Sequence, residues 1–126
     1  MSLEITGISD RGVLAEERIG FSVDGDTDLQ FYLVYKAEFL GQSIDFENQS
    51  DAVFWFTSIK AKAGDKVVLY TKSGQASSRK NPDGTSIYFF YWIKTEPLFS
   101  ALNKGVVLVN INSWRNSQGR IVPKAE

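Results

Sequence analysis

The amino-acid sequence predicts an all-β fold, an antiparallel sandwich of about seven strands with one short helical turn. Three observations lead to this prediction. Short apolar stretches rich in β-branched and aromatic residues recur along the chain, and clusters of Gly, Asp, Asn and Ser separate them. Within some stretches apolar and polar residues alternate, which is the period of a strand with one buried face. Short strands at this spacing are typical of an antiparallel sandwich or barrel.

The predicted strands follow one another with turn signals between them. We expect strands at residues 3 to 8, 17 to 23, 29 to 36, 52 to 58, 66 to 72, 86 to 93 and 106 to 111. The clearest alternation is in the second strand, where Ile19, Phe21 and Val23 share one face. This strand should therefore bury one side and expose the other.

Three polar segments predict turns. The sequence DGDTD at residues 24 to 28 predicts a hairpin between the second and third strands, because Asp and Gly tolerate left-handed or side-chain-capped backbone. Residues 63 to 65 (AGD) give the same signal before the fifth strand, and residues 81 to 84 (NPDG) before the sixth.

Residues 96 to 103 predict the helical turn. Pro97 stands at an early helical position, apolar residues follow it, and Asn103 with Gly105 would end the turn. One or two turns are the most that this segment can form.

Length and composition predict one globular domain. The chain has 126 residues, of which 43% are hydrophobic and 13% aromatic, enough to build a single core over residues 1–126. Residues 1–2 and 116–126 are expected to be loosely held. The sequence has no apolar run long enough to cross a bilayer, no secretion signal and no cysteine, so we expect a soluble cytoplasmic protein without disulfides.

The residue inventory argues against enzyme chemistry. The chain has neither His nor Cys, which excludes a Ser/His/Asp or Cys/His nucleophile, a histidine base and the usual zinc sites. Glu16 and Glu17 are adjacent in a strand, so their side chains point to opposite faces and cannot flank one substrate bond. We expect no catalytic activity and no cofactor.

The sixth predicted strand carries aromatic side chains on both faces. Ile87, Phe89 and Tyr91 share one face, and Tyr88, Phe90 and Trp92 share the other. The third and fourth strands repeat this pattern, yet a sandwich buries only one face of each strand. The remaining aromatic surface must be covered by the loops at 37 to 51 and 94 to 104, by a second copy, or by a ligand. The candidate interaction surface predicted from this pattern consists of Tyr32, Tyr88, Phe90 and Trp92.

Two charged segments raise weaker hypotheses. The first hypothesis is a weak calcium site, because calcium ligands can alternate as Asp24, Asp26 and Asp28 do. An EF-hand loop that starts at Asp24 would need Gly and Glu at the positions of Leu29 and Tyr35. We therefore expect this segment to form a turn. Residues 60 to 80 contain six Lys or Arg and one acid, and Lys72, Arg79 and Lys80 form a candidate basic loop for weak nucleic-acid contacts. The acidic pI of about 5.5 argues against nucleic acid as the principal partner.

Two stretches resemble the lamin tail domain, an immunoglobulin-like sandwich found in nuclear lamins and many bacterial proteins. The first is EERIGFSVDGDTDLQFYLVY at residues 16 to 35, and the second is FWFTSIKAKAGDKVVLY at residues 54 to 70. Trp92 and the VVLVN segment from residue 106 fall where the family has a Trp and a last apolar strand. The chain departs from the family at Tyr32, where a Gly-Trp pair is common. The resemblance implies a stand-alone bacterial relative with an immunoglobulin-like fold.

The family resemblance implies an interaction module without catalytic residues. We therefore expect a non-catalytic protein-interaction or assembly domain whose partner is another protein or a second copy of itself. The alternatives are a carbohydrate- or ligand-binding module that stacks sugars on exposed aromatics, and weak nucleic-acid binding through the basic residues 60 to 80.

Overall fold

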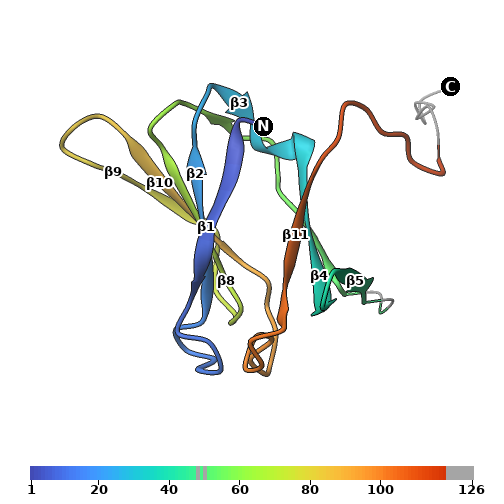
Figure 1. Ribbon diagram of the computed structural model, residues 1–126. Coiled ribbons are helices and arrows are strands. Elements are labelled where there is room, and N and C mark those ends of the chain that lie inside the picture. Colours follow the sequence, from blue (N-terminus) through green and yellow to red (C-terminus); the bar gives the residue numbers. More distant parts are fainter. Residues whose placement is uncertain (48, 50, 119–126) are drawn as a thin grey trace, which may run out of the picture.

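Two β-sheets face each other and enclose the core (Figure 1). The computed structural model describes residues 1–47, 49 and 51–118. The five-stranded sheet has the order β1 (Leu3–Ser9), β2 (Arg18–Val23), β8 (Lys66–Tyr70), β10 (Ser86–Tyr91), β9 (Ser77–Lys80). The four-stranded sheet contains β11 (Lys104–Asn110), β4 (Tyr32–Leu40) and β5 (Ser43–Phe46) in that order, and β6 (Val53–Trp55) also pairs with β4. The predicted all-β sandwich is confirmed.

Short elements join the two sheets at one end. β3 (Thr27–Asp28) pairs with β7 (Lys60–Ala61), and a 3-10 turn, η1 (Leu29–Phe31), leads into β4. The side chain of Asp28 accepts a hydrogen bond from the amide of Gln30 and so caps η1. This turn replaces the first three residues of the strand that was predicted at 29 to 36.

The core is built from the inward faces of both sheets. Ile19, Phe21 and Val23 of β2 are 1–2% exposed, which confirms the alternation predicted for this strand. Val34 of β4 and Val106 of β11 are buried opposite them. Fully burying a side chain of this size stabilises a fold by about 1.5–3 kcal/mol.

The segment after β2 crosses between the sheets, so the hairpin predicted at residues 24 to 28 is wrong. β2 pairs with β1 and β8, whereas β4 belongs to the other sheet. The turn predicted at residues 81 to 84 is confirmed, since the amide of Gly84 donates to the carbonyl of Asn81 over 3.0 Å. This turn connects β9 to β10. In the sheet, β10 lies between β9 and β8. It pairs antiparallel with β9 and parallel with β8, so the prediction of a wholly antiparallel sandwich is wrong for the β8–β10 pair.

Residues 96–103 all lie in the described part of the chain and form bends and turns, so the predicted helical turn is wrong. The backbone groups of this segment bind side chains from elsewhere. The amides of Leu98 and Phe99 donate to the carboxylate of Glu17, and the Arg11 guanidinium donates to three carbonyls in and just after the segment. These partners take the place of intrahelical hydrogen bonds.

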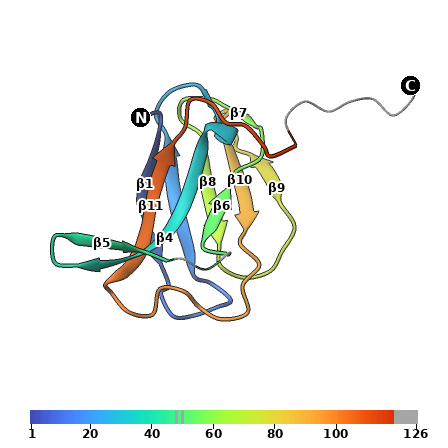
Figure 2. The same ribbon diagram turned by 90° about the vertical axis from the view of Figure 1, so that its right-hand side faces the viewer.

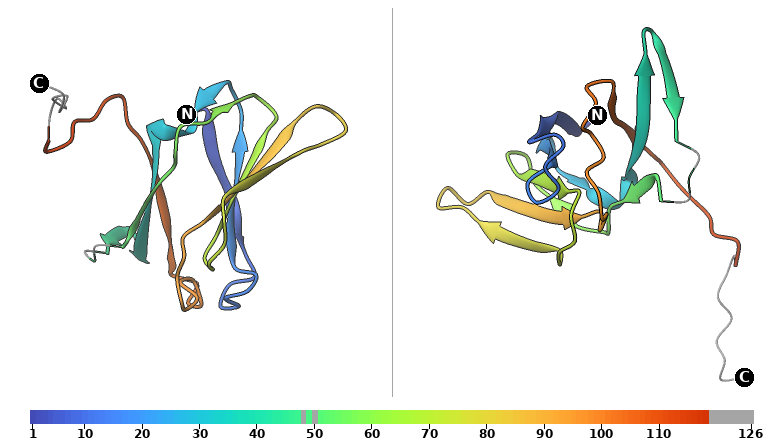
Figure 3. Two further views of the ribbon diagram at one scale, coloured as in Figure 1. Left: turned by 180° about the vertical axis from the view of Figure 1, so that it is seen from behind. Right: turned by 90° about the horizontal axis from the view of Figure 1, so that it is seen from below.

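Two hairpins project from the sandwich (Figures 2 and 3). Figure 2 shows the β4–β5 hairpin extending away from the body, and the right-hand view of Figure 3 shows it together with the β9–β10 hairpin. Gly41, with φ +63°, opens the turn between β4 and β5, a backbone conformation that favours glycine. Residues 119–126 of the predicted loose terminus lie outside the described part of the chain.

Candidate functional site

The predicted aromatic surface does not exist as an exposed surface. Tyr32 is 2% exposed, Phe90 3% and Trp92 8%, and all three belong to the core. Tyr88 is half-buried and packs against the same core. The prediction of these residues as an interaction surface is therefore wrong, and so is their use as a platform for stacking sugars.

Strand register explains why this face of β10 points inward. Ile87 lies opposite Lys66 of β8 on one side and Arg79 of β9 on the other. Residues that pair across a sheet share a face, and charged side chains need water, so the odd-numbered residues of β10 face solvent. The alternation alone could not distinguish the two faces, because both are aromatic.

The outer face of the four-stranded sheet carries exposed aromatic side chains. Val34 points into the core, so the odd-numbered residues of β4 and the residues paired with them point outward. We call the apolar face nine of these outward residues, without the buried Ala37 and Gly105: Leu33, Tyr35, Phe39, Ile44, Phe46, Val53, Trp55, Val107 and Val109. None of these nine carries a charge. Ile44 is 48% exposed, Phe46 47% and Trp55 45%.

Ring contacts organise the apolar face. The rings of Tyr35 and Phe46 meet edge to face, with centroids 5.1 Å apart, and those of Trp55 and Trp114 meet at 5.2 Å. The indole N–H of Trp55 donates to the carbonyl of Gln30 over 2.7 Å. The polar atom of this indole is thus satisfied inside the chain, while the apolar body of the ring stays partly exposed.

Sequence reasoning missed the part of the apolar face that lies on β5. Residues 37 to 51 were expected to form a covering loop, but most of them extend β4 and form the projecting β4–β5 hairpin. A signal was present in the sequence. Gly41 and Gln42 form a two-residue turn, and the alternating Ile44 and Phe46 follow it directly, a pattern that favours a hairpin.

The outer face of the five-stranded sheet combines aromatic and basic side chains. We call the aromatic–basic face the outward residues Lys66, Val68, Tyr70, Arg79, Ile87, Phe89 and Tyr91, together with Lys72 just after β8. The rings of Tyr70 and Tyr91 stack at 5.4 Å with an interplanar angle of 12°. Lys72 Nζ lies 4.8 Å from the centre of the Tyr70 ring, and Arg79 Cζ lies 5.8 Å from that of Phe89.

This arrangement corrects the candidate basic loop. Arg79 and Lys80 lie in strand β9, at the edge of the sheet, and only Lys72 lies in a loop. The structure brings Lys72 and Arg79 to one face of the sheet. Lys80, which pairs with Ser86, is the next residue along β9, so it lies on the opposite face of the sheet from Arg79.

The three aspartates of the DGDTD segment bind separate partners: Asp24 accepts a hydrogen bond from the Ser22 hydroxyl, and Asp26 and Asp28 accept from backbone amides. Asp28 accepts hydrogen bonds from the Ser58 hydroxyl and the Ile59 amide, at 2.9 and 3.2 Å, and pairs with Lys60 at 3.2 Å. Burial raises the pKa of Asp28, but the hydrogen bonds and the Lys60 ammonium together lower it below its usual value. Asp26 accepts from the Ala63 amide. In the part of the chain that the structure describes, no three acidic side chains cluster closely enough to hold a metal ion.

Glu17 is a fully buried carboxylate whose oxygens are occupied by the chain itself. It accepts hydrogen bonds from the Thr71 hydroxyl and from the amides of Gly12, Leu98 and Phe99. Burial raises the pKa of Glu17, but these four donors together bring it below its usual value. The Glu17 side chain is therefore a structural anchor with no oxygen directed to solvent.

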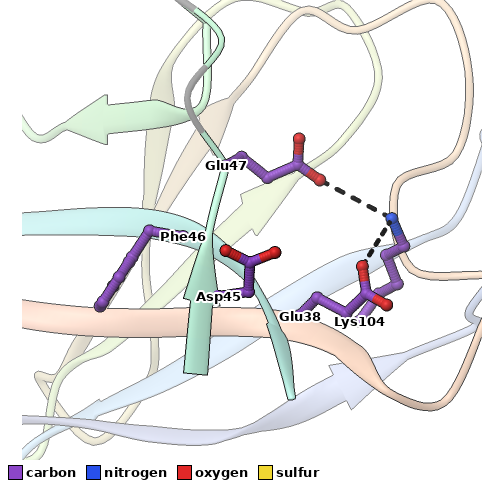
Figure 4. Close-up of a pocket in the computed structure, with 5 residues that line it drawn as sticks. All are labelled: Glu38, Asp45, Phe46, Glu47 and Lys104. Atoms are coloured by element: carbon purple, nitrogen blue, oxygen red, sulfur yellow. Dashed lines mark ion pairs between the residues drawn. The ribbon is translucent and has the colours of Figure 1, made fainter. Parts of the chain in front are cut away.

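A hollow of about 320 Å³ lies beside the β4–β5 hairpin (Figure 4). Three carboxylates, from Glu38, Asp45 and Glu47, line it together with Phe46. Lys104 Nζ lies 3.7 Å from both Glu38 Oε2 and Glu47 Oε1. One ammonium against three carboxylates leaves the hollow net negative, and its ion pairs lie at the rim of the apolar face.

Compared with known proteins, the chain matches no family model, no curated protein and no solved structure. The resemblance to the lamin tail domain therefore stays a prediction. Among the described residues, the structure contains no helix with the length and apolar character needed to cross a membrane.

Proposed function

We propose that this chain is a non-catalytic assembly module that pairs with a second copy of itself through the apolar face. The observation that carries the proposal is an entire outward sheet face without a charged residue, in which Ile44, Phe46 and Trp55 are each nearly half exposed. Contiguous apolar patches of this kind on folded domains mark interaction sites.

The size of the apolar face suits a dimer. A fully exposed large side chain offers about 150–250 Å² of surface, so the partly exposed residues of the face together present roughly 600 Å². A standard interface buries about 800 Å² on each partner, including a polar rim. The ion-paired residues around Lys104, at the edge of the face, are suited to such a rim.

The charge pattern favours a second copy over an unrelated partner. A two-fold interface presents the same patch on both subunits, so any charge near its centre meets charges of its own sign. An uncharged patch avoids that repulsion. The projecting β4–β5 hairpin extends the apolar face beyond the body of the sandwich, where a second molecule can cover Ile44 and Phe46 (Figure 2).

A matched pair of valines tests the proposal. Val107 lies on the apolar face and Val68 on the outer face of the other sheet, and both are half-buried. Sedimentation equilibrium of the wild-type chain should give a dimer mass at micromolar concentration. Val107→Glu should raise the dissociation constant by at least tenfold, because the new carboxylate would be buried against its own copy, whereas Val68→Glu should leave it unchanged. A wild-type monomer throughout this range, or equal effects of the two substitutions, would refute the proposal.

A further inference from the structure

The aromatic–basic face places three outward rings next to one another on β8 and β10. The parallel pairing of these strands sets Tyr70 beside Tyr91, and Phe89 lies two residues before Tyr91 on the same face, about 6.6 Å away along the strand. All three rings are partly exposed. Gly74 packs directly against Tyr91, since a Cβ at that position would lie 2.4 Å from the ring. This contact braces Tyr91, and with it the stacked Tyr70.

The cations among these rings are not held in ion pairs. Lys66, Lys72 and Arg79 make no ion pair with any described residue, whereas Lys60, Lys62, Lys94 and Lys104 each pair with a carboxylate. Unpaired cations gathered on one face attract anions, and the attraction is strongest for a polymer with a charge on every unit.

We propose that the aromatic–basic face binds single-stranded nucleic acid, either DNA or RNA. Proteins that bind single strands combine a cationic track for the phosphates with aromatic rings on which exposed bases stack. Here Lys66, Lys72 and Arg79 supply the cations, and Tyr70 and Phe89 supply rings beside them. A duplex keeps its base faces stacked inside, so it could use the cations alone.

On β2, next to the rings, this face is polar. Gly20 lies opposite Val68, the hydroxyl of Thr6 fills the space above Gly20, and Arg18 lies opposite Tyr70. The apolar face lies on the opposite side of the sandwich (Figure 1), and dimer formation through it leaves the aromatic–basic face open. The two proposals therefore stand on different residues and can fail separately.

The test is fluorescence anisotropy with labelled oligothymidine and oligouridine of equal length, at low salt and at about 0.15 M salt. We expect binding to both, weakened by salt. The double substitution Lys72→Ala with Arg79→Ala should weaken binding at least tenfold. Phe89→Leu, which preserves apolar packing, should weaken it about tenfold, because a base can no longer stack on an aromatic ring at this position.

Matched controls separate this site from general charge effects. Lys60→Ala with Lys62→Ala removes two cations that are already ion-paired, and should change the affinity less than twofold. The monomeric Val107→Glu variant should still bind the oligonucleotides. Circular dichroism and thermal melts confirm that each variant is folded. The proposal is overturned if neither oligonucleotide binds at low salt, if the control pair weakens binding as much as Lys72 and Arg79 do, or if duplex DNA and heparin bind as tightly as the single strands and Phe89→Leu has no effect.

Discussion

The hydroxyl of Thr71 donates a hydrogen bond of 2.5 Å to Oε2 of Glu17, and both side chains are almost completely buried. Through the same carboxylate, Glu17 also holds the amides of Leu98 and Phe99. One charged side chain thus ties the end of β8 to the irregular segment that precedes β11. The five-stranded sheet and the loop that closes this end of the sandwich are joined at this carboxylate.

Replacing Glu17 should destabilise the fold strongly. Glu17→Gln keeps the size of the side chain but turns one acceptor oxygen into an NH₂ group facing donors. Hydrogen bonds to charged groups contribute about 1.5–3 kcal/mol each, and an unsatisfied buried donor costs a further 1–3 kcal/mol. We expect the free energy of unfolding to fall by about 3 kcal/mol, measured by urea denaturation.

Glu16→Gln is the matched control, because Glu16 is the adjacent residue and is exposed. It should change the free energy of unfolding by less than about 0.5 kcal/mol, as surface substitutions usually do. Similar small effects of both substitutions would show that Glu17 does not anchor this end of the sandwich.

Acid should weaken the protein through the same residue. The folded-state pKa of Glu17 lies below its ordinary value of 4.5, so its carboxylate contributes stability above about pH 4.5 and loses this contribution as pH falls through the folded-state pKa. Asp28 acts in the same direction below its ordinary value of 3.8. Urea denaturation between about pH 6 and pH 3 should show stability falling with pH, and a shallower fall in Glu17→Gln. Identical pH profiles for the wild type and this variant would contradict the assignment.

Strand positions could be read from the sequence more completely than strand faces. The alternation of Ile19, Phe21 and Val23 predicted their burial, because only one face of β2 is apolar. In β10 both faces are aromatic, and the orientation is decided by Lys66 and Arg79 on neighbouring strands. Those pairings are set by topology, which local periodicity does not contain. Aromatic surface does remain outside the core, on the outer faces of both sheets, but Tyr32, Phe90 and Trp92, which were predicted to form it, point inward.

Long-range hydrogen bonds explain the other errors. Pro97 and the apolar residues after it favour a helix locally, yet the Glu17 carboxylate binds the Leu98 and Phe99 amides from about 80 residues away in the sequence. Tertiary contacts of this kind override local propensity. The hairpin predicted at residues 24 to 28 failed for a related reason, since the chain there moves from one sheet to the other.

Relieving the backbone at Ile93 should stabilise the protein. Ile93 has φ +62°, a left-handed conformation that is unfavourable for a β-branched residue, and its side chain is 63% exposed. The flanking hydrogen bond from the Lys94 amide to the Thr71 carbonyl holds the chain in this shape. Ile93→Gly should raise the free energy of unfolding by about 1 kcal/mol, because glycine adopts this conformation without strain.

Ile5→Gly provides the comparison for this substitution. Ile5 is also an exposed isoleucine, at 39%, but it lies in strand β1. Its replacement should lower the free energy of unfolding by about 0.5–1 kcal/mol, the usual cost of glycine inside a strand. Thermal melts that show Ile93→Gly to be as destabilising as Ile5→Gly would mean that the positive φ at Ile93 carries no strain.

The most direct test of self-assembly uses the absence of cysteine in the chain. Single cysteines at Val107 and, as a control, at Val68 would be treated with a short bis-maleimide linker, since sheets that pack face to face lie about 10 Å apart. We predict a covalent dimer from Val107→Cys in high yield and little from Val68→Cys. Equal low yields from both positions would contradict pairing through the apolar face.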